Sequence, residues 1–164
     1  MRVLVATASK HGATAEIGQA IADELIARGV DAAAVPAGDA ESVDGYDAVV
    51  LGSAVYAGHW LPAATAFADR HGPRLHGRPV WLFSSGPVGD PPKPEEEPVD
   101  AGPMVETCAA REHVVFAGRI DRKKLGFGEK AIVMALRAPE GDFRDWDAVR
   151  AWAAGIGEQL RERP

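Results

Sequence analysis

The stretch that decides the fold lies at the start of the chain, where Arg2-Val-Leu-Val-Ala6 runs into Thr7-Ala-Ser-Lys-His-Gly-Ala-Thr14. The first five residues predict a short buried strand. The next eight form a loop with hydroxyl groups and one glycine, and a helical pattern continues from Ala15. The first N–H groups of a helix have no partner within it, and the helix dipole adds positive charge there. The stretch therefore predicts an anion site, for which a phosphate is the natural occupant.

The spacing within this loop narrows the kind of phosphate site. The phosphate loop of NTPases needs Gly-x-x-x-x-Gly-Lys-Ser/Thr, and the dinucleotide fold needs Gly-x-Gly-x-x-Gly; here only Gly12 is present. Ser9-Lys10-His11-Gly12-Ala13-Thr14 instead resembles the FMN-phosphate loop of flavodoxins, which uses hydroxyls and amides without a metal. An ordinary strand-to-helix turn with a polar cap is the alternative.

Composition limits the classes of function. The 164 residues carry a formal net charge of −6, which argues against nucleic acid as the main partner. We see no apolar run near the roughly 18 residues of a transmembrane span and no signal peptide before the first strand, so we expect no transmembrane segment and a cytoplasmic location. Cys108 is the single cysteine, and no metal spacing or catalytic triad order stands out. We therefore expect neither a metal site nor a catalytic residue of the protein itself.

Strand and helix patterns alternate along the chain, which predicts a parallel sheet covered by helices on both faces. We expect a flavodoxin-like three-layer α/β/α sandwich with a five-stranded parallel sheet of order 2-1-3-4-5. It would form a single flavodoxin-like domain over residues 1–164, with an irregular Pro-rich loop at 85–103 and an insert at 119–139. The expected strands are 2–6, 30–35, 47–53, 79–84 and 113–118, and the expected helices are 13–28, 61–71, 104–111, 127–138 and one that starts near Asp145.

The last helix carries the clearest amphipathic pattern. Asp145 is a good N-cap, and apolar residues then step by three and four. We expect this stripe to pack in the core rather than to touch a ligand; it consists of Trp146, Val149, Trp152, Ile156 and Leu160.

Three loops are expected at one edge of this sheet, outside the carboxyl ends of the strands, where doubly wound sheets bind ligands. They are 7–14, 52–60 and 84–92. The second loop offers flat side chains at Tyr56, His59 and Trp60 for an isoalloxazine ring, although Trp60 could instead pack the next helix onto the sheet. The candidate FMN-binding residues are Thr7, Ser9, Lys10, His11, Gly12, Ala13, Thr14, Ser53, Ala54, Val55, Tyr56, Ala57, Gly58, His59, Ser85, Gly86, Pro87, Val88, Gly89 and Asp90.

Several motifs together identify a family resemblance. They are Ser9-x-x-Gly12-x-Thr14, Gly52-Ser-Ala-Val-x-x-Gly58-His59, Phe116-Ala-Gly118 and the pair Asp145-Trp146 after an insert. With these motifs the chain resembles the flavodoxin superfamily over residues 2–160, and within it the menaquinone-dependent protoporphyrinogen dehydrogenase branch. The resemblance implies non-covalently bound FMN and electron transfer.

Three functions stay open. The chain is expected to be an FMN electron carrier or small flavoenzyme that works with a redox partner protein or a quinone-like small molecule. The alternatives are a quinone-dependent protoporphyrinogen oxidase and a flavin-free binding or regulatory domain that kept the fold. The insert is short and poor in aromatics, and 119–137 holds six basic and two acidic residues. We therefore expect it to dock a protein partner rather than to contact a membrane.

Overall fold

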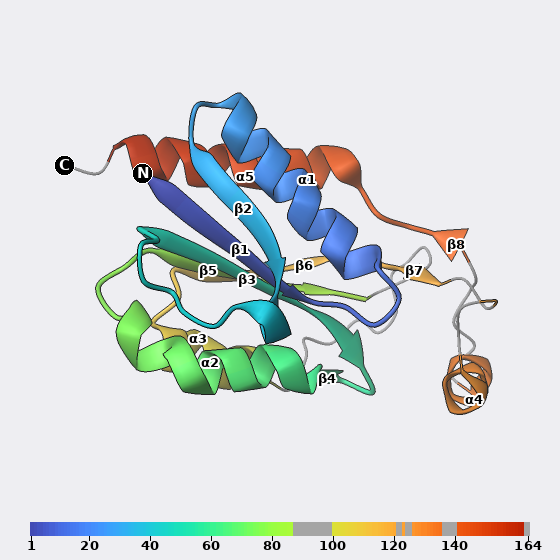
Figure 1. Cartoon of the computed structure of the whole chain (residues 1–164). Helices are drawn as coiled ribbons and strands as arrows, with labels where there is room; N and C mark the ends of the chain where they lie inside the picture. The colour runs from blue at the N-terminus through green and yellow to red at the C-terminus, as the bar shows by residue number, and fades with distance from the viewer. Residues whose placement is uncertain (87–99, 121–122, 124–125, 136–140, 163–164) are drawn as a thin grey trace.

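A parallel sheet forms the centre of the molecule (Figure 1). The computed structural model describes residues 1–86, 100–120, 123, 126–135 and 141–162. Five parallel strands lie in the order β2-β1-β3-β5-β6, which confirms the predicted order; the numbering differs because β4 is a short strand that pairs antiparallel with β3. The strands are β1 (Arg2–Ala8), β2 (Asp31–Pro36), β3 (Ala48–Tyr56), β4 (His59–Trp60), β5 (Val80–Ser85) and β6 (Glu112–Phe116).

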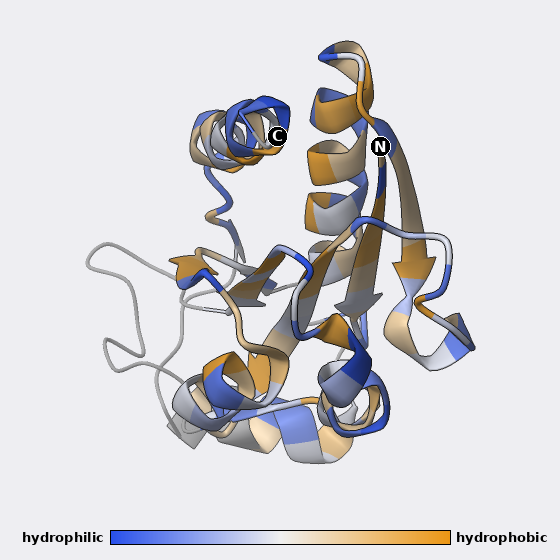
Figure 2. Ribbon diagram, turned by 90° about the vertical axis from the view of Figure 1, so that its left-hand side faces the viewer, coloured by the Kyte–Doolittle hydropathy of each residue, from blue (hydrophilic) through white to orange (hydrophobic). Residues whose placement is uncertain are grey.

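Helices cover both faces of this sheet (Figures 1 and 2). α1 (Ala13–Ala27) and α5 (Trp146–Arg161) lie on one face, and α2 (Pro62–Leu75) and α3 (Ala101–Cys108) lie on the other. Successive residues of a strand point to opposite faces, so Val3 and Val5 pack under α1 and α5. Leu4 packs toward α2 and α3. Burial on both faces explains why the first strand reads as a continuous apolar run.

The structure corrects the predicted loop at 52–60. Strand β3 contains Gly52 and Ser53, which lay in both the predicted strand and the predicted loop, and it continues through Ala54, Val55 and Tyr56. A hairpin then pairs Tyr56 with His59, and its two turn residues Ala57 and Gly58 both have positive φ, at 51° and 80°. These angles suit the type I′ turn, whose twist matches that of the flanking strands. The prediction ended the strand at Ser53 because alanine at a turn position gives no turn signal.

The helix boundaries of α2 and α3 differ from the prediction. α2 continues to Leu75, past the predicted end at 71, and contains Pro73 in its last turn. α3 begins at Ala101, three residues earlier than predicted. α4 (Phe127–Ala135) confirms a helix in the insert; residues 136–138 of the predicted helix lie outside the described residues.

A small antiparallel pair joins the start of the insert, β7 (Arg119–Ile120), to β8 (Gly141–Asp142) just after it. A 3-10 turn, η1 (Ala37–Asp39), follows β2. α5 then begins as predicted, because the side chain of Asp145 accepts a hydrogen bond of 3.1 Å from the N–H of Ala148. Most of the predicted stripe is buried, while Trp146 and Trp152 are partly buried at its edge. Among the described residues, no helix has the length and apolar character to cross a membrane.

Candidate functional site

Ser9–Thr14, the segment that joins β1 to the first residues of α1, is called the phosphate loop below after the phosphate predicted for it from the sequence. Gly12 is the N-cap of α1 with φ of 92°, and its N–H donates to Oγ of Ser9 at 3.0 Å. The first helical hydrogen bond runs from the N–H of Glu16 to the carbonyl of Gly12. Within the described residues, no side chain caps this helix. The N–H groups of the first turn, from Ala13 onward, are therefore available to an anion in front of the helix.

Close packing fixes the start of α1 against the end of β1. Thr7 and Thr14 are buried on either side of the loop. Gly18 lies so near Thr7 that a Cβ on it would stand 2.5 Å from the Thr7 methyl. The absence of a side chain at Gly18 thus lets helix and strand approach, which holds the loop in one position relative to the sheet.

The hairpin β3–β4 places one aromatic ring beside the phosphate loop. Nζ of Lys10 lies 5.8 Å from the ring centroid of the partly buried Tyr56. Trp60 has a different place: it is buried among the residues under α2, and its Nε1 donates to Oγ of Ser84 at 2.7 Å. Of the two aromatic candidates, Trp60 therefore packs in the core, and Tyr56 is the ring that borders the loop.

The other candidates on this hairpin divide between core and surface. Ser53 is fully buried, and its hydroxyl donates to the carbonyl of Ala54 and accepts the N–H of Leu61. His59 is 59% exposed, and its Nδ1 lies 3.3 Å from Oδ2 of Asp100. The same carboxylate oxygen accepts the N–H of Trp60 at 2.8 Å. Asp100 thus anchors the hairpin, a role that no local sequence pattern indicated.

The third loop is described only at its beginning. Ser85 is buried at the end of β5, and the N–H of Gly86 donates to the carbonyl of Phe116 at 3.2 Å. A Cβ on Gly118 would stand 3.0 Å from the Cα of Gly86, so the chains leaving β5 and β6 touch there. The candidates Pro87, Val88, Gly89 and Asp90 lie outside the described residues.

The insert contributes a carboxylate that sequence reasoning missed. Oε1 of Glu129, on α4, lies 2.6 Å from Nζ of Lys10, and Oε2 lies 2.7 Å from Nε2 of His11. Although burial raises the pKa of Glu129, the hydrogen bonds from Lys10 and His11 prevail and lower it to about 2. Burial, with a smaller effect of the Glu129 charge, raises the pKa of Tyr56 to about 12. Glu129 is therefore an ionised carboxylate, and Tyr56 a neutral phenol, at neutral pH.

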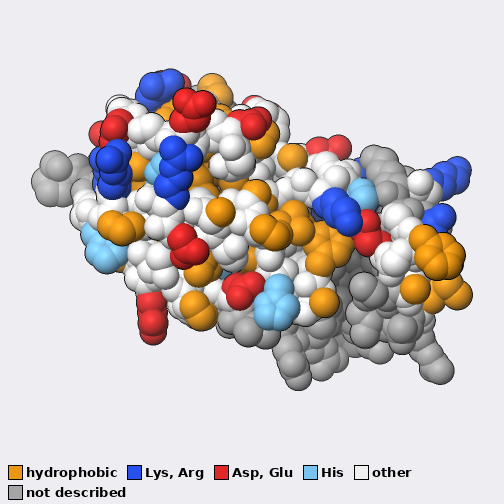
Figure 3. Space-filling model, turned by 60° about the horizontal axis from the view of Figure 1, so that its bottom comes forward, with side chains coloured by type: hydrophobic (Ala, Val, Ile, Leu, Met, Phe, Trp, Pro, Cys, Tyr) orange, Lys and Arg blue, Asp and Glu red, His pale blue; other side chains and the backbone are white. Residues whose placement is uncertain are grey.

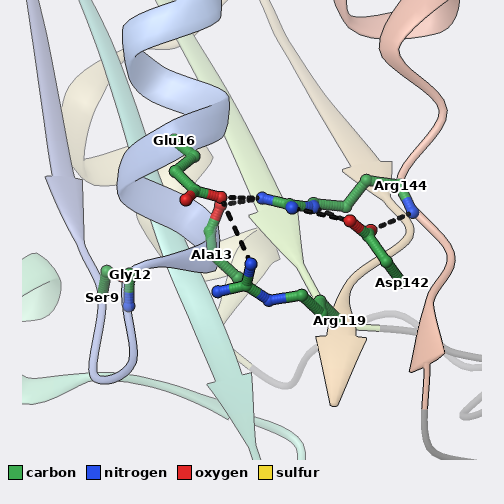
Figure 4. A network of polar contacts seen from close by, with 7 residues as sticks. All are labelled: Ser9, Gly12, Ala13, Glu16, Arg119, Asp142 and Arg144. Carbon is green, nitrogen blue, oxygen red and sulfur yellow. Dashed lines mark hydrogen bonds and ion pairs between the residues drawn. The ribbon is translucent and has the colours of Figure 1, made fainter. Parts of the chain in front are cut away.

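A second ionic group ties the insert to the first turn of α1 (Figure 4). Arg144 donates to both carboxylate oxygens of Asp142, to Glu16 and to the carbonyl of Ala13. A nitrogen of Arg119 lies 3.6 Å from the same Glu16 carboxylate. More than a hundred residues separate Glu16 from both arginines, so no local pattern could have indicated these contacts.

Metal and thiol chemistry have no support among the described residues. No group of three or more histidine, cysteine or acidic side chains there could hold a metal ion. Cys108 is fully buried, and burial, helped by the charge of Asp69, raises the pKa of its thiol to about 11. A protonated, buried thiol is a poor nucleophile.

The comparisons with known proteins agree with this geometry. A family model described as "Flavodoxin domain" matches residues 4–147. The chain belongs to this flavodoxin family. Protoporphyrinogen IX dehydrogenase [quinone] of Escherichia coli K12 is 30% identical to this chain over an alignment of 181 positions, gaps included. The alignment covers 100% of the chain and 98% of the relative.

Solved structures support the same fold. A flavodoxin from the domain Archaea superposes with a TM-score of 0.67 at 14% identity, over 99% of this chain and 100% of that one. Oxidised flavodoxin 1 from Bacillus cereus gives a TM-score of 0.64 at 13% identity, over all of both chains. At these identities the likeness shows the flavodoxin fold and nothing further.

Proposed function

We propose that this chain binds FMN without a covalent bond at the carboxyl edge of its sheet and uses it to transfer electrons. The observation that carries the proposal is the uncapped start of α1, with the hydroxyl of Ser9 in front of it and the ring of Tyr56 at its side. Membership of the flavodoxin family supports a redox function of this kind.

The residues present suit the two ends of FMN. The N–H groups at the start of α1 and the hydroxyls of Ser9 and Thr14 would hold the phosphate, an anion that helix N-termini favour. Tyr56, as a neutral phenol, would supply a flat face for the ring. Bound FMN would supply one- or two-electron chemistry; the protein would fix its orientation and the access of its partner, a redox protein or a quinone-like molecule.

The test of this assignment is a comparison of FMN with riboflavin, which lacks the phosphate. We expect the Ser9→Ala/Thr14→Ala double variant to lose a few kcal/mol of FMN binding, because a hydrogen bond to a charged group contributes about 1.5–3 kcal/mol. Its affinity for riboflavin should change little. Ser42→Ala/Thr107→Ala is a matched control, since it removes one serine and one threonine hydroxyl that bond elsewhere.

Fluorescence titration of both ligands against the three proteins decides the matter. Wild-type affinity for FMN in the Ser9→Ala/Thr14→Ala protein would place the phosphate elsewhere. A purified protein that stays colourless and binds neither ligand would instead favour a flavin-free binding or regulatory domain.

Quinone-linked oxidation of protoporphyrinogen is the second candidate, and the likeness to the Escherichia coli enzyme favours it. Under anaerobic conditions, protoporphyrinogen IX and a menaquinone analogue should then yield fluorescent porphyrin only when FMN and protein are both present. A protein that binds FMN but forms no porphyrin above the rate without protein would leave the electron-carrier function as the better proposal.

A further inference from the structure

Both basic side chains of the phosphate loop, Lys10 and His11, already contact one carboxylate of the same chain. Glu129 reaches Lys10 with one oxygen at 2.6 Å and His11 with the other at 2.7 Å. The N–H of Gly126 lies 3.5 Å from the first of these oxygens. The two oxygens of this carboxylate thus contact two neighbouring side chains of the loop, as the oxygens of a bound anion would. An isolated ion pair on the surface would make one such contact.

The surroundings of Glu129 distinguish it from the rest of its helix. The side chain of Glu129 is only 15% exposed, whereas Phe127 is 93% exposed and Met134 is exposed as well. On the face drawn in Figure 3, acidic, basic and histidine side chains meet on the right of the molecule, and exposed hydrophobic side chains lie beyond them. Among the described side chains of α4, Glu129 is thus the one that is turned inward, and its ion pairs hold the helix over the loop.

The charges around the loop show what a phosphate would meet. Three cations, Lys10, Arg119 and Arg144, lie within ion-pair distance of three carboxylates, Glu16, Glu129 and Asp142. Glu16 and Asp142 pair with the two arginines, so Glu129 is the carboxylate that balances Lys10. A phosphate beside Lys10 would bring further negative charge next to Glu129, and like charges at such range repel.

We propose that Glu129 is an internal stand-in for the phosphate: it pairs with Lys10 and contacts His11 until FMN binds, and the FMN phosphate then displaces it. The inference rests on the proposed FMN site and adds a mode of regulation to it: the phosphate and α4 compete for the same two side chains. FMN binding should therefore release α4 from the loop. Because such coupling is reciprocal, a partner that binds α4 in its present place should weaken FMN binding by the factor by which FMN weakens binding of that partner.

The first experiment measures FMN and riboflavin affinity in Glu129→Gln. The variant should bind FMN about tenfold more tightly, a factor that corresponds to about 1.4 kcal/mol, because the phosphate no longer displaces a charged group. Riboflavin affinity should stay within about twofold. Glu158→Gln is the matched control, since Glu158 is an exposed residue of α5 and its substitution changes the net charge equally.

The outcomes separate this inference from the proposed function. Equal affinity of the wild-type protein for FMN and riboflavin would defeat the phosphate site itself. A wild-type preference for FMN that Glu129→Gln leaves unchanged, or weakens, would defeat the inference alone. An equal gain in Glu158→Gln would show that net charge, not the contact with Lys10 and His11, is responsible.

A second measurement follows α4 directly. Hydrogen–deuterium exchange of the amides in 127–135 should become faster when FMN is added to the wild-type protein. In Glu129→Gln the exchange should already be fast, and FMN should add little. Exchange that slows on FMN binding would mean that α4 closes over the cofactor, and the proposed competition would then be wrong.

Discussion

Removing Arg144 should loosen the insert from the body of the protein and destabilise the fold. Its side chain is 4% exposed and donates to Asp142, to Glu16 and to the carbonyl of Ala13, while its guanidinium lies 4.6 Å from the ring centroid of Trp146. These contacts join β8 and the start of α5 to the first turn of α1. Arg144→Ala removes all of them at once.

The structure sets the size of the effect. Breaking a buried ion pair costs about 3–5 kcal/mol when a buried charge is left behind, but Asp142 and Glu16 are 43% and 52% exposed and can be hydrated. We therefore take one charge-assisted hydrogen-bonded pair, about 1.5–3 kcal/mol, and about 0.5–1 kcal/mol for the ring contact. Together these two contributions predict that the free energy of unfolding falls by about 2–4 kcal/mol.

Urea unfolding measures this difference, and Arg150→Ala is the matched control. Arg150 pairs with Asp147 at 2.7 Å on the surface of α5, where such a pair contributes about 0.3–0.5 kcal/mol. A loss below about 0.5 kcal/mol in Arg144→Ala, equal to that of the control, would refute the argument that burial and multiple acceptors make this arginine different.

The pH dependence provides an independent check. Hydrogen bonding from Arg144 is the main cause that lowers the pKa of Asp142. A carboxyl whose pKa is lower in the folded state stabilises the fold above its unfolded pKa, and that contribution is lost as pH falls through the lowered value. The difference between wild type and Arg144→Ala should therefore be full at neutral pH and shrink below about pH 4, the ordinary range of Asp.

Two further predictions concern the candidate site. Gly52→Ala should lower the free energy of unfolding by about 1–3 kcal/mol in urea unfolding, because its Cβ would stand 2.1 Å from the ring of Phe83, whereas Gly102→Ala, with nothing within 4 Å, should not destabilise. Tyr56→Leu should raise the fluorescence of bound flavin, because a stacked tyrosine quenches it, and Trp60→Phe should leave this fluorescence unchanged, because Trp60 packs in the core. The opposite result would place the flavin ring against Trp60.

The sequence predicted those parts of the fold that local patterns determine. Apolar runs buried on both faces gave the central strands, and Asp145 with its stripe gave the last helix; the structure confirms both. The prediction was wrong at Ala54–Tyr56, which continue strand β3 beyond its predicted end at Ser53. There the hairpin depends on Ala57 at positive φ, a conformation that alanine seldom adopts and that pairing across β3 and β4 imposes.

The electrostatics of the candidate site depend on pairs that are distant in sequence. The sequence analysis predicted Lys10 and His11 as FMN-binding residues and the bases of 119–137 as a docking surface for a protein partner. In the structure, Arg119 is paired with Glu16, and Glu129 faces Lys10 and His11. Periodicity and motif spacing carry no information about which of these charges meet, because register between the insert and α1 follows from tertiary packing.

These pairings change how the insert should be understood. Arg119 begins β7 and Glu129 lies on α4, so both belong to the insert. Arg119 contacts Glu16, just after the phosphate loop, and Glu129 contacts Lys10 within it. A protein partner that docks on the insert would therefore act through contacts that also reach the phosphate loop. Docking of a protein partner on the bases of 119–137 stays a prediction. Under the proposed competition, a partner that pulls Glu129 away from Lys10 should favour FMN binding, and a partner that presses α4 against the loop should oppose it.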